Sequence, residues 1–256
     1  MITASNGENG HEQYRDLYRK IKRLFPLPSF VSAGRHRLAP CPVSGGMGTG
    51  CGAGTGIFTR ALLQRFHDVA AVEPNGDMRE KFLEQLPAVP CLAATGENTG
   101  IAGRSVDLIT VAQAFHWLDE ERFKAEACRI LRPGGKVAII WNTSVKDEFT
   151  RARDRVCQTF CPRFRAGHAG KRSAEEGDDF LLNHYFRKVE FASFPNPFVM
   201  DQEMFEGNVR SRSYALPPEH ADHEKFMAEL RLVFERYAVN GSVTENQMTQ
   251  IYLGAF

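Results

Sequence analysis

The sequence has almost no net charge and no long apolar segment. Lysine and arginine number 32 against 31 aspartates and glutamates, so the formal net charge is +1 over 256 residues. A nearly neutral chain has no global attraction to nucleic acid or to an anionic membrane surface. No stretch approaches the roughly 20 apolar residues that a membrane-spanning helix needs. We therefore expect no nucleic-acid partner and no membrane partner, and a small molecule is the favoured ligand.

Paired cysteines are missing too. The six cysteines are scattered, with no CxxC pair and no His/Cys spacing that would suit zinc. Cys157 and Cys161 are spaced to share one helix face, and we predict buried, reduced thiols there. The polar, acid-containing residues 1–16 suit neither a signal peptide nor a transit peptide. These features predict no metal site and a cytoplasmic location.

One short segment is locally basic. Residues 151–172 carry seven arginines and lysines with few acids. Nucleic-acid-binding segments usually add interleaved aromatic residues, which are sparse here, and the whole chain is neutral. We therefore interpret the segment as a solvated helix face.

From about residue 47, short apolar runs alternate with segments of helical periodicity. This alternation, with short connections, predicts a doubly wound α/β fold in which right-handed crossovers join parallel strands. After residue 142 the alternation stops, and we predict polar helices over 145–185 and an amphipathic helix at 226–237. The predicted strands lie at about 47–51, 68–74, 91–97, 106–113, 136–141, 188–194 and 250–256, and the helices between the first five at 57–66, 78–86 and 121–131.

A glycine-rich turn at residues 50–56 follows the first strand and opens a helix. Glycines there let the backbone approach a ligand closely, and the helix start offers unpaired N–H groups. Such a turn suits either a dinucleotide pyrophosphate or the amino-acid end of S-adenosylmethionine (SAM). Residues 48–53 also satisfy the GxGxxG/A fingerprint of nicotinamide cofactors. An NAD(P)-dependent oxidoreductase is therefore one alternative.

Two further strand ends carry polar groups. Glu73 ends the second strand, where an acid can accept hydrogen bonds from both ribose hydroxyls of a nucleoside, or can simply be solvated before a turn. His116 and Trp117 follow the fourth strand, and together they offer a hydrogen-bonding or basic group beside an aromatic wall. A purely structural histidine is the other interpretation. Ligands of open α/β sheets bind at these carboxyl ends.

Four segments carry a family resemblance. GAGTGIFTRALL, VAAVEPNGDMRE, SVDLITVAQAFHW and RILRPGGKVAIIWN stand in the order and spacing of class I SAM-dependent methyltransferases. More narrowly, residues 47–256 resemble the small-molecule branch (methyltransferase type 11) that includes trans-aconitate methyltransferase-like proteins. The resemblance implies a Rossmann-like, seven-stranded, mostly parallel sheet whose last strand is antiparallel. It also implies a SAM-binding core at 47–142 and a helical cap with the last two strands at 143–256. Residues 1–46 do not share the resemblance, and we predict an N-terminal helix and linker there from the helical spacing of apolar residues at 14–25 and the Pro-, Gly- and Ser-rich composition of 26–46.

The same resemblance implies a cofactor site and a reaction. The function expected is methyl transfer from SAM to a small molecule, with carboxylates among the candidate acceptors. Residues that match the family's SAM-binding positions are Gly52, Ala53, Gly54 and Gly56 for the methionine part, Glu73 for the ribose, Pro74, Met78, Thr95, Gly96 and Glu97 for the adenine, and Ala112 and Gln113 beside the sulfonium.

The residues that we predict to bind the methyl acceptor are chosen by their side-chain chemistry. A carboxylate acceptor needs cations rather than a base, and Arg210 and Arg212, with Tyr214, are candidates because an arginine fork matches a carboxylate. A hydroxyl or amine acceptor needs a base, and His116 is the candidate for that catalytic role, with Trp117 beside it.

One position departs from the family pattern. Gly50 stands where these enzymes usually carry an acid, in a first strand that is unusually rich in glycine. Glycine weakens a strand because it costs backbone entropy and offers no side chain for packing. A non-catalytic relative that keeps the fold is therefore a further alternative.

Overall fold

The computed structural model describes residues 47–256 except residues 65, 166–167 and 170–171. The N-terminal helix and linker predicted for residues 1–46 lie outside the described residues. The described chain divides into two compact units. The first unit holds the residues up to Trp141 together with Asp178–Phe194 and Gln250–Phe256, and the second holds Asn142–Gly177 and Pro195–Thr249.

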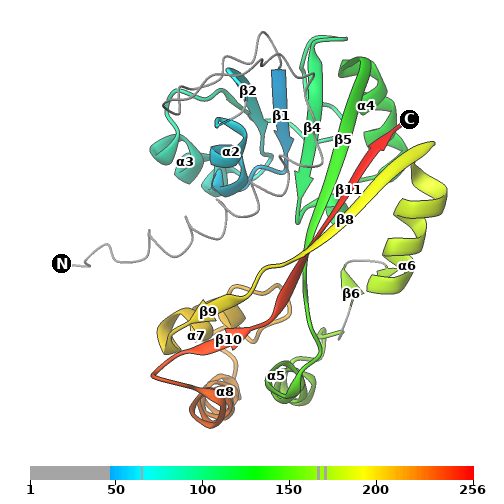
Figure 1. Cartoon of the computed structure of the whole chain (residues 1–256). Coiled ribbons are helices and arrows are strands. Elements are labelled where there is room, and N and C mark those ends of the chain that lie inside the picture. The colour runs from blue at the N-terminus through cyan, green and yellow to red at the C-terminus, as the bar shows by residue number, and fades with distance from the viewer. Residues whose placement is uncertain (1–46, 65, 166–167, 170–171) are drawn as a thin grey trace, which may run out of the picture. The chain divides into compact units, whose positions relative to one another are not determined.

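The first unit is built on a seven-stranded sheet with the order β3-β2-β1-β4-β5-β11-β8 (Figure 1). Strand β1 lies between β2 and β4 and is parallel to both, and β2–β3 and β4–β5 are parallel as well. Strand β11 runs opposite to its neighbour β5 (Figure 1). The predicted seven-stranded, mostly parallel sheet is confirmed. The strands are β1 Met47–Cys51, β2 Asp68–Val72, β3 Cys91–Leu92, β4 Val106–Ala112, β5 Leu131–Ser144, β8 Lys188–Pro195 and β11 Gln247–Ala255.

Helices cover both faces of this sheet because successive side chains of its strands point to opposite sides. Ile109 of β4 packs in one apolar cluster with helix α4 and the π-helix η2. Leu108, the preceding residue, packs in another cluster with α2 and α3. The sheet is therefore doubly wound, as predicted. The helices of this unit are α2 Ile57–Leu62, α3 Gly76–Gln85, the 3-10 helix η1 Phe115–Trp117, α4 Glu120–Ile130 and η2 Phe180–Tyr185.

The glycine-rich strand β1 is fully formed. All five of its residues pair with β2, and residues 48–50 pair with β4. Glycine at position 48 leaves room for a ring, because a Cβ there would lie 3.1 Å from Cγ of Phe66. At Gly50 a Cβ would meet only the hydroxyls of Thr59 and Thr110, each at 3.7 Å, which is ordinary contact. Hydrogen bonding along the strand thus offsets its lack of side chains.

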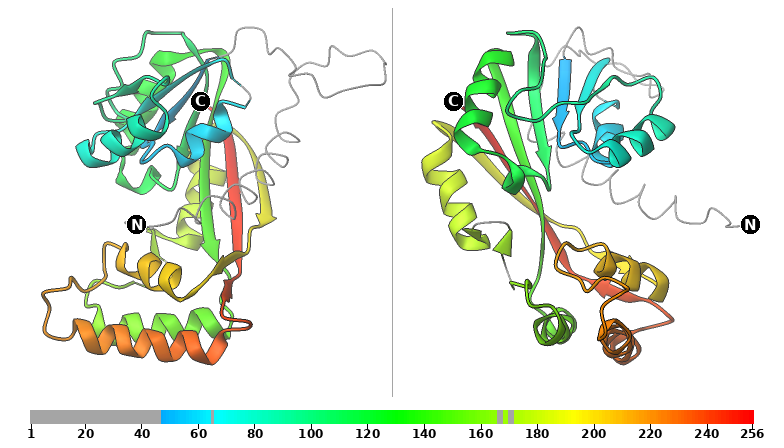
Figure 2. Two further views of the ribbon diagram at one scale, coloured as in Figure 1. Left: turned by 90° about the vertical axis from the view of Figure 1, so that its left-hand side faces the viewer. Right: turned by 180° about the vertical axis from the view of Figure 1, so that it is seen from behind.

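The second unit has its own core of helices, together with two small two-stranded sheets. Helices α5 and α8 lie side by side (Figure 2), and Phe149, Phe226 and Leu230 are buried between the elements of this unit. Cys157 and Cys161 are buried and free, as predicted, and burial raises the pKa of Cys157 to about 12. The elements are α5 Glu148–Phe160, β6 His168–Ala169, β7 Arg172–Ser173, α6 Ala174–Asp179, whose last residues belong to the first unit, β9 Phe198–Met200, α7 Gln202–Arg210, α8 His223–Tyr237 and β10 Val243–Glu245.

The helices of the described residues differ in length and composition from membrane spans. Within the described ranges, none is both long and apolar enough to cross a bilayer.

Candidate functional site

The glycine-rich turn between β1 and α2 adopts a conformation that favours glycine. Gly52 and Gly54 have φ angles of 66° and 55°, in the left-handed region. A Cβ at Gly52 would lie 2.6 Å from Cβ of Ala114, so glycine is needed there for packing. A Cβ at Gly54 would meet no atom within 4 Å, so the backbone of Gly54 is open on that side. A ligand could therefore approach the turn at Gly54.

A buried carboxylate holds this turn against the end of β2. Glu73 is only 5% exposed, and its Oε2 accepts a hydrogen bond of 2.8 Å from the backbone N–H of Gly54. Its Oε1 accepts one of 2.9 Å from the N–H of Asn75. Burial excludes the interpretation of Glu73 as a solvated acid. Each carboxylate oxygen has a second lone-pair direction, so the group can accept two further hydrogen bonds from a ligand.

The residues that the resemblance assigns to the adenine lie on two neighbouring connections. Met78 is 47% exposed on the first turn of α3, whose N-terminus is capped by the side chain of Asn75. Thr95 is exposed, whereas Gly96 is buried, and a Cβ at Gly96 would lie 2.9 Å from Cδ2 of Leu118. Oε1 of Glu97 accepts a hydrogen bond of 2.8 Å from the N–H of Asp119. The connection after β3 is therefore tied to the connection after β4.

A second buried carboxylate, that of Glu126 in α4, anchors the same connection after β3. Thr99 donates to Oε1 of Glu126 twice, from its backbone N–H at 2.8 Å and from its hydroxyl at 2.5 Å. Arg129 donates to both oxygens of that carboxylate, at 2.7 and 2.8 Å. The hydrogen bond from Arg129 is the main cause that lowers the pKa of Glu126 to about 2.

The end of β4 carries a strained residue. Gln113 has a φ of 59°, which side chains other than glycine seldom adopt. Its N–H still bonds to the carbonyl of Ile140 at 2.9 Å, so β5 holds the strained turn in place. Such strain is often found at functional sites. Ala112 precedes it as the last residue of β4.

His116 lies close to two tryptophan rings. The ring centroid of Trp117 is 4.7 Å away and that of Trp141 is 5.5 Å away. Nδ1 of His116 is buried and has no hydrogen-bond partner among the described residues. Burial also lowers the pKa of His116 below its ordinary value of 6.5. Phe115, which packs edge-on against Phe123 and Tyr185, anchors the turn that carries the histidine.

Comparisons with known proteins bear on this site. The methyltransferase domain family matches residues 49–139. A methyltransferase-like protein of Schizosaccharomyces pombe is 31% identical over 182 residues, which cover 70% of this chain and 69% of that protein. The chain belongs to the methyltransferase family.

Two further similarities agree with this assignment. An uncharacterised methyltransferase of Mycobacterium tuberculosis is 44% identical over 92 residues, which is 36% of this chain and only 38% of that relative. A solved structure from Anaeromyxobacter dehalogenans, described as a candidate type II methyltransferase, is similar with a TM-score of 0.65 over 94% of this chain and 95% of that one. Its sequence identity of 22% makes it evidence for the methyltransferase fold alone.

The residues predicted for a carboxylate acceptor belong to the second unit. Arg210 and Arg212 are exposed, and Nη2 of Arg212 donates to Oδ1 of Asn208 at 3.1 Å. Tyr214 is half-buried, with its ring 4.9 Å from that of Phe164, and burial raises its pKa to about 12. Participation of Arg210, Arg212 and Tyr214 in the same site as His116 stays a prediction.

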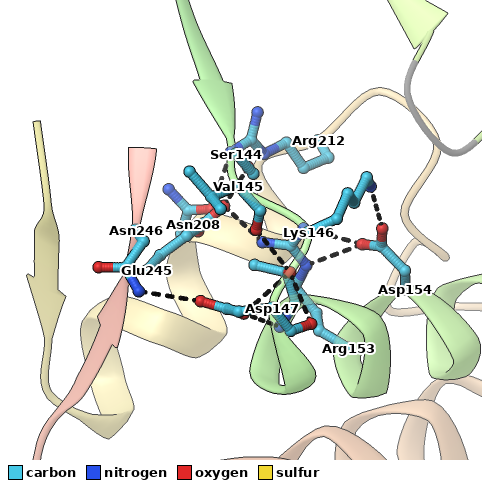
Figure 3. Close-up of polar contacts among 11 residues, drawn as sticks. Ser144, Val145, Lys146, Asp147, Arg153, Asp154, Asn208, Arg212, Glu245 and Asn246 are labelled. Atoms are coloured by element: carbon cyan, nitrogen blue, oxygen red, sulfur yellow. Dashed lines mark hydrogen bonds and ion pairs between the residues drawn. The ribbon is translucent and has the colours of Figure 1, made fainter. Parts of the chain in front are cut away.

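The basic segment 151–172 is more structural than expected. Arg153 is only 9% exposed and bridges Asp154 at 2.8 Å and Glu245 at 2.7 Å (Figure 3). Ser144 also donates to Glu245, and Lys146 bonds to Asp154 at 2.6 Å. The interpretation of the whole segment as a solvated face is therefore wrong at Arg153. This arginine joins α5 to β10 within the second unit.

Trp141 is a residue of this region that the sequence analysis did not single out. It ends the predicted strand at 136–141, and the rule that ligands bind at the carboxyl ends of parallel strands could have identified it. Its neighbour in space, His116, was singled out because it follows β4 in the same way.

Proposed function

We propose that this protein transfers a methyl group from SAM to a small molecule. The observation that carries the proposal is the bond between Glu73 and the N–H of Gly54. It joins a buried carboxylate, which can accept hydrogen bonds from ribose hydroxyls, to a turn whose backbone is open to a ligand.

The residues present fit SAM chemically. The N–H groups of Gly52, Ala53 and Gly56 bond to backbone carbonyls and that of Gly54 bonds to Glu73. The open backbone at Gly54, rather than a set of unpaired donors, therefore suits the approach of the methionine part. Glu73 suits the two ribose hydroxyls, and the exposed side chain of Met78 suits one face of the adenine. Thr95 and Glu97 would line its amino edge. When bound, SAM supplies a methyl carbon that its sulfonium makes electrophilic.

The chain's own contribution is alignment and exclusion of water. Ala112 and Gln113 end β4 next to the turn that carries His116, so the acceptor would approach over this edge of the sheet. A carboxylate acceptor would be held by Arg210 and Arg212 with Tyr214, since an arginine fork binds both oxygens of a carboxylate. The reduced, buried thiols of the second unit support a cytoplasmic location for this activity.

The oxidoreductase alternative loses its main support in the structure of the turn. Gly48 and Gly50, the first two glycines of the nicotinamide fingerprint, pair with Leu108 and Thr110 inside β1. The fingerprint requires those glycines at the turn after the strand, where the pyrophosphate binds. We therefore favour methyl transfer.

A non-catalytic member of the family is the second candidate, and Gly50 favours it. The missing acid removes a carboxylate that would orient the turn and the SAM ammonium. Space for a Cβ exists at this position, so Gly50→Asp can restore the acid without a backbone clash.

Calorimetric titration with SAM and with S-adenosylhomocysteine tests both candidates. We expect micromolar binding by the wild type and a loss of about 10- to 100-fold in Glu73→Gln, because hydrogen bonds to a charged group are lost. Glu80→Gln, on the exposed side of α3, is the matched control. Absence of heat with the wild type would sink the methyltransferase proposal. Tight binding that appears only in Gly50→Asp would instead support the non-catalytic candidate.

A further inference from the structure

His116 differs from Glu73 and Glu97, the acids of the candidate site, because its ring has no hydrogen-bond partner among the described residues. Glu73 accepts two backbone N–H groups, and Glu97 accepts the N–H of Asp119. Within the described part of the chain, Nδ1 of His116 is buried without a partner and Nε2 forms no hydrogen bond, while the residue as a whole is only half-buried. Nε2 is therefore the ring nitrogen that a ligand can reach.

Burial of Nδ1 decides where the neutral ring carries its proton. A neutral imidazole has one proton, on one of its two nitrogens. A proton on Nδ1 would be a buried N–H donor without an acceptor, which folded proteins seldom contain. With the proton on Nε2, the buried atom keeps only a lone pair, and the N–H group is presented to the ligand. The Nε2–H tautomer is thus favoured.

The same geometry disfavours a general base. A base acting through Nε2 needs its lone pair there, so the proton would have to sit on the enclosed Nδ1. Histidine bases usually have that second N–H held by a carboxylate or a carbonyl. Here the neighbouring rings of Trp117 and Trp141 are uncharged. Of the ionisable groups in the adjoining connection, Asp119 caps α4 at the N–H of Arg122 and Glu97 binds the N–H of Asp119.

We infer that His116 is a fixed, neutral hydrogen-bond donor whose Nε2–H group binds an acceptor oxygen that is already ionised. This assignment rests on the proposed function and names the acceptor class as a carboxylate. A carboxylate lone pair forms the new O–C bond to the methyl carbon, while the C–S bond breaks and its electron pair stays on sulfur. The two opposite charges cancel, a methyl ester forms, and no proton is released. His116 therefore keeps its Nε2 proton throughout.

Nitrogen-15 NMR of the histidine side chains tests the tautomer without any cofactor. His116→Gln identifies the signal by its disappearance. We expect the uncharged Nε2–H form at neutral pH and above, because burial keeps the pKa of His116 below its ordinary value. An Nδ1–H signal, or a cationic ring at neutral pH, would overturn the inference.

Variants test the donor role in turnover with methyl-labelled SAM and a panel of citrate, other small polycarboxylic acids, phenols and amines. The amide N–H of glutamine can replace Nε2–H, whereas that of asparagine cannot reach as far. We expect His116→Gln to keep kcat/KM within about threefold and His116→Asn to lose about 10- to 100-fold. The exposed His67→Gln is the control.

The product and the pH profile complete the test. We expect a methyl ester, which releases labelled methanol in mild base, and a flat profile above neutral pH. A base-stable methyl ether or amine would overturn the inference. It would also be overturned if both His116 variants lost activity and the wild-type rate rose with pH through an apparent pKa. If S-adenosylhomocysteine gives no heat, the proposed function fails, and the NMR result alone then decides the state of His116.

Discussion

The buried carboxylate of Glu126 provides a quantitative prediction. Its pKa falls from 4.5 to about 2, chiefly through the hydrogen bond from Arg129. This lowering of the pKa by about 2.5, at roughly 1.4 kcal/mol per pKa unit, corresponds to about 3 kcal/mol of stability at neutral pH. Arg129 is 46% exposed, so solvent screening reduces the expected contribution to about 2 kcal/mol. The carboxylate itself is only 7% exposed.

The sign of the pH dependence follows from the lowered pKa. The unfolded chain binds a proton at Glu126 more readily than the folded chain does. The contribution is therefore complete above the unfolded value of 4.5 and is lost as the pH falls toward 2.

Urea unfolding of Glu126→Gln against the wild type measures this contribution. At pH 7 we expect the variant to be less stable by about 2 kcal/mol. Its stability should also fall less steeply than that of the wild type between about pH 5 and pH 3, because one titrating group has been removed. The exposed Glu84→Gln is the control. Equal stability at pH 7, or an unchanged pH slope in the variant, would refute the reasoning.

Two other predictions concern the turn and the second unit. Gly52→Ala should destabilise the fold by about 1–3 kcal/mol in thermal unfolding, since its Cβ would clash with Ala114. Gly54→Ala carries only the cost of a left-handed φ without a clash, so it should destabilise the fold less while it weakens SAM binding in calorimetry. Equal losses of stability in the two variants would contradict the geometry. Arg153→Met should cost about 3–5 kcal/mol in urea unfolding, because it leaves the buried Glu245 without its cation; a loss below about 1 kcal/mol would contradict the burial of that pair.

Local sequence patterns predicted the doubly wound sheet, but they did not predict the lengths of its strands. The alternation of strands and helices predicted the doubly wound order because each apolar run must pack against a neighbour. Strand β3 was predicted over 91–97 but covers only Cys91–Leu92. The chain turns away there, since Thr95 bridges to Asn98 and Glu97 binds the N–H of Asp119. Strand β5, predicted at 136–141, extends over Leu131–Ser144 because it pairs with β4 already at Leu131.

The second unit was less predictable. Strand β9 is three residues long and forms only because Val243–Glu245 pairs with it from a distant part of the chain. So short a segment carries too few residues for a periodic signal. The burial of Arg153 has the same origin, because its partner Glu245 comes from that distant strand.

At the candidate site, the sequence determined which residue types stand at the ends of the strands. Glycines in the turn, an acid after β2 and a histidine after β4 are local features, because each follows a recognisable apolar run. Tertiary structure alone decided their pairings. It joined Glu73 to Gly54, brought Trp141 of β5 beside His116, and enclosed Nδ1 of that histidine without a partner in the part of the chain that the structure describes. These contacts join separate strands, and hydrogen bonding and burial depend on where the backbone places each atom in space.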